Sequence, residues 1–121
     1  IMAFLLVSSA AAVYMREDRS LLAGLKELHT FIEKIEKPVY IDDRSLMALD
    51  YISGYRLNSK IVPYPKDFKN ISDSYAVINK EMIKNLKAAN KNRQFPNEVE
   101  NPPARWQAIK EIDNIKVYYL P

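Results

Sequence analysis

The stretch PVYIDDRSLMALDYISGYRLNSKIVPYP, residues 38–65, decides the fold, because two short β-branched runs flank a helix-length segment. The runs at 38–43 and 60–65 are short, apolar and bounded by turn-forming residues, as strands are. The amphipathic segment 44–53 is followed by Gly54, and glycine readily takes the left-handed conformation that closes a helix. This alternation predicts a βαβ unit with parallel strands.

An acidic pair, Asp42-Asp43, lies at the junction between the first strand and the helix. We expect Asp43 to cap the helix, because its side-chain oxygen is placed to accept hydrogen bonds from the first free amides. Asp42 is then expected to pair with a nearby arginine or lysine.

The segments on either side of this unit also have recognisable patterns. Residues 20–36 have apolar side chains at helical spacing and charges on the other side, which predicts an amphipathic helix. Residues 75–79 predict a third strand, and Asn79 is placed to cap a helix running from Lys80 to about Asn90. Residues 90–103 are polar and rich in proline, which predicts an ordered surface loop.

The last segment allows two interpretations. Trp106, Ile109 and Ile112 fit one face of a helix, but they also fit a strand over 105–112. In the second case the chain turns at Asp113-Asn114 into a strand over 115–120, and two turn residues between apolar runs are a hairpin signal. We favour the hairpin because the closing residues have high strand propensity.

Together these elements predict the fold class α/β: a small, mainly parallel sheet with a βαβ core, flanked by helices and completed by a C-terminal antiparallel hairpin. Residues 16–121 are expected to form a single soluble domain, since 121 residues suit one domain with a modest core.

Residues 1–15 are almost entirely apolar. A helix of this length is about 22 Å long, shorter than the hydrocarbon core of about 30 Å. We favour the end of a transmembrane helix that begins upstream, with Tyr14 and Arg16 as interfacial and polar flanks. The alternatives are a buried or interfacial helix, or the core of a signal peptide.

Composition argues against several functions. The chain has two glycines, Gly24 and Gly54, too few for a dinucleotide fingerprint or a P-loop. It has no cysteine, so disulfides, thiolate catalysis and cysteine metal sites are excluded. The net charge is 18 − 15 = +3 with scattered basic residues, which does not favour nucleic-acid binding. His29, the single histidine, has no partner at metal-ligand spacing and is interpreted as a solvated or rim residue.

One candidate ligand-facing edge remains. Ligands bind outside the carboxyl ends of strands in open parallel sheets, which places Asp42, Asp43, Tyr64 and Asn79 near one edge. Two carboxylates are suited to a divalent ion or to acid/base chemistry. The simpler interpretation, which we favour, is a helix cap beside an ion pair. We therefore assign no catalytic, cofactor-binding or metal-binding residue.

Several short strings follow one another in a characteristic order. After the apolar stretch come Val39-Tyr40-Ile41-Asp42, Ile61-Val62-Pro63-Tyr64-Pro65, Tyr75-Ala76-Val77-Ile78-Asn79, Asn101-Pro102-Pro103 and Val117-Tyr118-Tyr119. In this order the chain resembles the soluble C-terminal domain of polytopic GT-C glycosyltransferases, whose relatives include protein O-mannosyltransferases and lipid A aminoarabinose transferases. The resemblance covers nearly the whole chain.

The resemblance implies a non-catalytic extracytoplasmic domain of a membrane enzyme that transfers a sugar from a polyprenyl-phosphate donor. In that family the catalytic carboxylates and any metal belong to loops of the membrane domain, so this chain alone is not expected to be catalytic and no cofactor is expected in it. The implied partners are the membrane domain of the same protein and a lipid-linked sugar or acceptor. The alternatives are a membrane-tethered ligand-binding or sensor domain without transferase activity, and a self-sufficient enzyme using Asp42 and Asp43.

Overall fold

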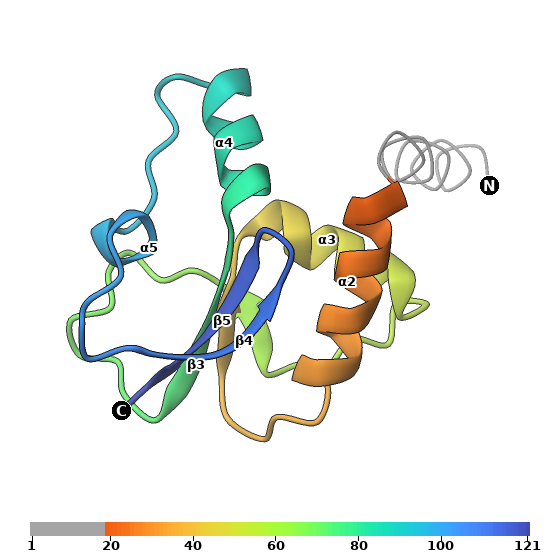
Figure 1. Ribbon diagram of the computed structural model, residues 1–121, viewed down its shortest axis with the longest axis horizontal. Coiled ribbons are helices and arrows are strands. Elements are labelled where there is room, and N and C mark those ends of the chain that lie inside the picture. The colour runs from red at the N-terminus through yellow and green to blue at the C-terminus, as the bar shows by residue number, and fades with distance from the viewer. Residues whose placement is uncertain (1–18) are drawn as a thin grey trace.

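Figure 1 shows the computed structural model of the chain, which describes residues 19–121. The expected end of a transmembrane helix, residues 1–15, lies outside this range. Within residues 19–121, no helix combines the length and the apolar character needed to cross a membrane. The elements, in chain order, are α2 (Arg19–Ile32), β1 (Val39–Ile41), α3 (Asp43–Ile52), β2 (Ile61–Pro63), β3 (Ser74–Asn79), α4 (Lys80–Ala89), α5 (Asn97–Glu100), β4 (Gln107–Ile112) and β5 (Ile115–Leu120).

The strands form one five-stranded mixed sheet in the order β2-β1-β3-β5-β4. β1 pairs in parallel with β2 and β3, whereas β5 pairs antiparallel with β3 and β4. The expectation of a mainly parallel sheet is wrong, because most of the paired residues are in antiparallel ladders. The reason is strand length: β1 and β2 have three residues each, while β3 and β5 have six each and pair along their whole length.

The two supersecondary units expected from the sequence are both present. β1, α3 and β2 form the βαβ unit with parallel strands. β4 and β5 form the hairpin, which turns at Asp113-Asn114 with Asp113 at φ 51°, so the helical alternative for this segment is wrong. The register shifts between Ala108 and Lys110, which leaves Ile109 as the extra residue of a bulge in the edge strand.

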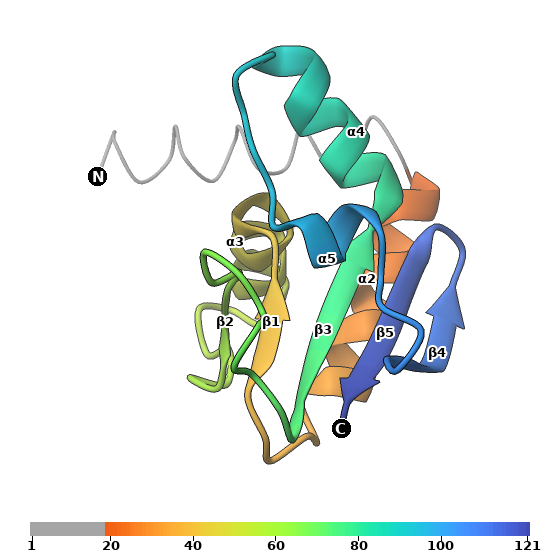
Figure 2. The same cartoon turned by 90° about the vertical axis from the view of Figure 1, so that its left-hand side faces the viewer.

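The sheet has a core on each face because side chains alternate along its strands. Val39 and Ile41 of β1 pack with α2 and α3, while Tyr40 points to the other face. There the core is built around Phe68 and Trp106, whose ring centroids lie 5.1 Å apart. Figure 2 shows α2 and α5 on opposite sides of the sheet. Residues 64–73 connect β2 to β3 without a helix, and Phe68, within this segment, is fully buried in this core.

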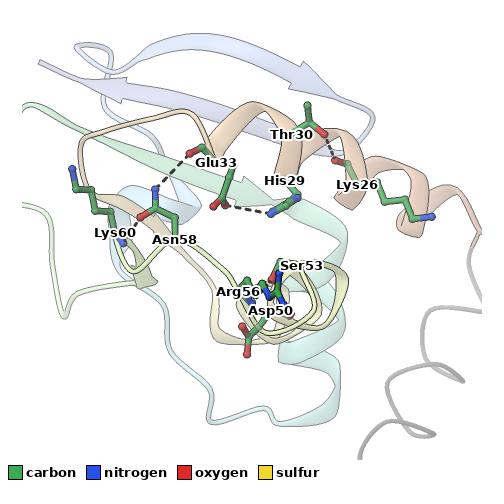
Figure 3. Close-up of polar contacts among 9 residues, drawn as sticks. All are labelled: Lys26, His29, Thr30, Glu33, Asp50, Ser53, Arg56, Asn58 and Lys60. Atoms are coloured by element: carbon green, nitrogen blue, oxygen red, sulfur yellow. Dashed lines mark hydrogen bonds and ion pairs between the residues drawn. The ribbon is translucent and has the colours of Figure 1, made fainter.

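The connections between elements are tied together by polar contacts. α2 ends at Ile32, four residues before the expected end at residue 36, and the chain then turns toward Pro38. Figure 3 shows that the Asn58 side-chain amide donates to the Glu33 carbonyl across 3.5 Å. The Lys60 ammonium donates to the Glu36 carbonyl. These contacts hold the residues just before β2 against the residues just after α2.

Helix α3 closes with a Schellman motif at Gly54. The Gly54 amide donates to the Tyr51 carbonyl and the Tyr55 amide donates to the Asp50 carbonyl. Gly54 has φ +68°, the left-handed conformation expected of it from the sequence.

Candidate functional site

A groove of about 530 Å³ opens at the carboxyl ends of β1 and β2. Its walls come from three separate segments of the chain: the end of β1, the end of β2, and the loop that follows α4. The lining residues are Asp42, Asp43, Pro63, Tyr64, Pro65, Lys66, Arg93, Gln94, Phe95 and Pro96. Three of the four residues expected at a ligand-facing edge therefore lie together, and the fourth, Asn79, does not line the groove.

Asp42 is the buried carboxylate of this groove, with 1% of its surface exposed. It has extended backbone angles (φ −65°, ψ 150°), and its Oδ2 accepts a hydrogen bond of 2.8 Å from the Ser45 amide. Asp42 is thus the N-cap of α3, so the assignment of that role to Asp43 is wrong by one residue. The cap must lie just outside the helix, and the helix already begins at Asp43.

The second oxygen of Asp42, Oδ1, is buried and has no hydrogen-bond partner among the described residues. Burial raises the pKa of the Asp42 carboxyl above its ordinary value, and hydrogen bonds from Ser45 oppose this in part. A buried acceptor without a partner is costly, typically about 1–3 kcal/mol. Asp42 is one of the residues that line the groove, while this oxygen itself is shielded from solvent.

Asp43 is the residue that forms the ion pair, which corrects the expectation that Asp42 does so. Its Oδ1 lies 2.5 Å from the Arg93 guanidinium and also accepts from the Arg44 amide at 3.0 Å. The Asp43 side chain is about half exposed, so the pair contributes little to stability. Its effect is to position Arg93, whose guanidinium also lies 5.2 Å from the Phe95 ring centroid.

Tyr64 forms a wall of the groove. Its hydroxyl donates to the Val77 carbonyl of β3, and its ring makes edge contacts with Phe68 and Phe95 at centroid distances of 6.1 and 6.4 Å. Burial, and to a lesser degree the charge of Asp42, raises the pKa of Tyr64 well above its ordinary value. The phenol therefore keeps its proton and serves as a fixed donor.

Asn79 has the capping role expected of it. Its side-chain oxygen accepts from the Met82 amide at 3.1 Å, at the start of α4. Its side-chain amide donates to the Ser45 hydroxyl across 3.5 Å. The Ser45 backbone amide in turn donates a hydrogen bond to Asp42 Oδ2. Asn79 does not line the groove, but its side chain connects the N-termini of α3 and α4.

Sequence reasoning missed the third wall, made by Arg93, Gln94 and Phe95. Arg93 lies fifty residues after Asp43 in a polar loop, and no spacing pattern connects the two. The expected ordered loop is present, but it contains the short helix α5 and folds back over the strand ends.

The remaining titratable residues add no metal-binding cluster to this region. In the part of the chain that the structure describes, no three His, Cys, Asp or Glu side chains are grouped to hold a metal ion. His29 is half-buried on α2, with its Nε2 3.2 Å from Glu33 Oε2, and does not line the groove.

Comparison of the chain with protein-family models, curated proteins and solved structures finds no match in any of the three. The groove combines two adjacent carboxylates, one guanidinium and two aromatic rings around a cavity of small-molecule size. Ligand pockets are typically about 300–1,000 Å³, with a few polar groups in apolar walls.

Proposed function

We propose that the groove binds a sugar ring, and that the chain is the non-catalytic extracytoplasmic domain of a membrane glycosyltransferase using a polyprenyl-phosphate sugar donor. The order of short strings along the chain supports the second part. The groove supports the first, and the observation that carries it is the buried, unpartnered Oδ1 of Asp42.

A sugar hydroxyl would supply the donor that this oxygen lacks, once the side chains that shield it from the groove move aside. Hydrogen bonds to an ionised group contribute about 1.5–3 kcal/mol, more than those between neutral groups. The Asp42 carboxylate is fixed by its capping bond to Ser45, so a ligand that donates to Oδ1 need not order the side chain first.

The other walls complement a polyhydroxylated ring. Arg93 is held by Asp43 and donates toward acceptor oxygens, while Phe95 and Tyr64 offer apolar ring surfaces. Such a mixture of aromatic surface and a few oriented polar groups is typical of small-molecule sites. The location at the carboxyl ends of parallel strands is also where such sheets bind ligands.

The test is a titration of the full chain with methyl α-mannopyranoside in a zwitterionic detergent that contains no sugar headgroup. Backbone amide resonances of Asp43, Ser45 and Arg93 are expected to shift with saturation. Asp42→Asn keeps a capping oxygen and removes the charge, so it is expected to weaken binding at least tenfold. The matched control, Asp73→Asn, changes an exposed carboxylate away from the groove and is expected to leave the affinity unchanged.

Resonance shifts confined to other surfaces, or equal affinity in Asp42→Asn, would contradict the sugar site.

A second candidate, a tethered binding or sensor domain without transferase activity, is favoured by the same groove, since a binding site needs no attached enzyme. The coding sequence upstream of Ile1 separates the two. Many apolar spans with an acidic external loop support the transferase, and a single span supports the tethered domain.

A further inference from the structure

Helix α4 carries a row of lysines on its exposed side. Lys80, Lys84 and Lys87 recur every three or four residues, so they lie on one face of the helix. Lys91 follows the helix and lines, together with Lys87, a second groove of about 530 Å³. All four side chains are exposed. We call these four side chains the lysine row.

The lysine row is the charged side of an amphipathic helix. The opposite side of α4 is buried through Met82, Ile83 and Leu86, which fixes the direction in which the lysines face. Glu81 is the one acidic residue within α4. Of the row, only Lys87 forms an ion pair with another residue of the 19–121 region, and its partner is Glu100. Most of the positive charge is therefore not neutralised by neighbouring side chains.

The position of α4 relates the lysine row to the N-terminal apolar stretch. Both views place α4 at the same end of the molecule as the start of α2, at Arg19 (Figures 1 and 2). Only three residues separate the apolar stretch 1–15 from Arg19 in the sequence. The membrane anchor that the sequence predicts at residues 1–15 would therefore hold α4 near the bilayer surface.

We propose that the lysine row binds the anionic headgroups of a phospholipid bilayer. Each lysine near an anionic surface strengthens binding about fivefold, so the three lysines without an ion pair supply about 100-fold. A row along an exposed helix suits an extended charged surface. The groove beside Asp42 then opens near the membrane, because α4 and the strand ends share one end of the molecule. The inference rests on the proposed membrane location but requires no sugar in the groove.

The first test compares binding of the full chain to vesicles of phosphatidylcholine alone and to vesicles that also contain phosphatidylglycerol. The variant combines Lys80→Glu, Lys84→Glu and Lys91→Glu, and leaves the ion-paired Lys87 in place. Its preference for anionic vesicles is expected to fall by at least about 100-fold. A control with the same change in net charge combines Lys34→Glu, Lys69→Glu and Arg105→Glu, all exposed in turns outside α4. It is expected to lose less than about fivefold, and equal losses in both would overturn the proposal.

A second measurement remains informative when residues 1–15 hold the chain on both kinds of vesicle. The rate of lysine acetylation is followed by mass spectrometry on the wild-type chain. Lys80 and Lys84 are expected to react at least threefold more slowly on anionic than on neutral vesicles, while Lys34 and Lys69 react equally on both. Equal rates at all four positions would overturn the proposal.

Two further measurements separate lipid binding from nucleic-acid binding and from the sugar site. Tighter binding to a DNA duplex than to anionic vesicles, lost in the same triple variant, would overturn the proposal in favour of a nucleic-acid surface. The triple variant is expected to bind methyl α-mannopyranoside as the wild type does, since none of its changes lies in the groove beside Asp42. Failure of the lysine row and failure of the sugar site are therefore measured separately.

Discussion

Asp42 combines a stabilising and a destabilising interaction in one side chain. Its Oδ2 caps α3, while its Oδ1 is buried without a hydrogen-bond partner in the described chain. A polar group buried without a partner lowers the free energy of unfolding. Such local conflicts are concentrated at functional positions, because a ligand can satisfy what the fold leaves unsatisfied.

Replacing Asp42 by asparagine tests this conflict. The native carboxyl holds its proton more tightly than the unfolded one, since its pKa is raised. Wild-type stability should therefore fall as the pH rises from the unfolded value of 3.8 through the native pKa. Asp42→Asn keeps a capping oxygen but does not titrate, so it does not show this loss. In urea unfolding, the free energy of unfolding of Asp42→Asn should therefore compare less favourably with that of the wild type at pH 3 than at pH 7. Asp42→Ala, which removes the cap, should cost about 1 kcal/mol.

Asp73 gives the opposite pH dependence at the other end of the sheet. Hydrogen bonds from Lys37 and Tyr119 lower the pKa of Asp73, and Asp73 raises the pKa of Lys37. The stability from this cluster is present between these pKa values; it is lost as pH falls through the native pKa of Asp73, or rises through that of Lys37. Asp73→Asn should flatten both arms of a plot of melting temperature against pH. A change that persists in 1 M salt would contradict an origin in exposed charges.

At the scale of elements, the two glycines have different tasks. Gly24 lies inside α2, where an added Cβ would sit 3.7 Å from Asp113, Ile112 and Ile115, an ordinary contact distance. Gly54 has φ +68° with open space around it, so only its backbone conformation requires glycine.

Alanine at these two positions should therefore change stability in opposite directions. Gly24→Ala should raise the free energy of unfolding by about 0.5–1 kcal/mol, because alanine is the better helix former. Gly54→Ala should lower it by about 1–2 kcal/mol, the penalty for a side chain in the left-handed region. Urea unfolding of both variants measures the difference. A loss of stability at Gly24 would show that α2 packs more tightly on the hairpin turn than these distances indicate.

Local patterns predicted most elements but missed features that depend on distant residues. The βαβ unit, the third strand, α4 and the hairpin are confirmed, because each depends on periodicity and nearby turn or capping residues. Asp42 and Asp43 are both acceptable caps, and only the observed start of α3 decides between them. The Asp43–Arg93 pair forms only when a loop fifty residues away folds back, which no local pattern records.

At the scale of the whole molecule, the position of β5 determines the character of the sheet. β5 lies between β3 and β4, and its buried residues face both sides: Val117 packs with α2 and α3, and Leu120 with the Phe68 core. A strand with apolar residues on both faces is typical of an interior position. That signal was present in the sequence, but the hairpin was expected as an addition to a parallel sheet, so the long β3–β5 ladder was missed.

Two cores that share one sheet should unfold together, because β3 and β5 contribute alternate side chains to both. Phe68 is fully buried and meets Tyr40, Tyr64 and Trp106 at centroid distances of 5.6, 6.1 and 5.1 Å. Phe68→Ala should therefore cost about 3–5 kcal/mol. Phe95→Ala, at a half-buried position against Tyr64, is the control and should cost clearly less.

The cooperativity of this unfolding is measured with two probes on the same Phe68→Ala sample. Trp106 fluorescence reports the core around Phe68, and far-ultraviolet circular dichroism reports the helices as a group, most of whose residues are in α2 and α3. The two transitions should coincide at a lowered midpoint, because the shared strands transmit the loss to both faces. A fluorescence transition that precedes the loss of helix would instead show that residues 64–73 and the loop over the groove open independently.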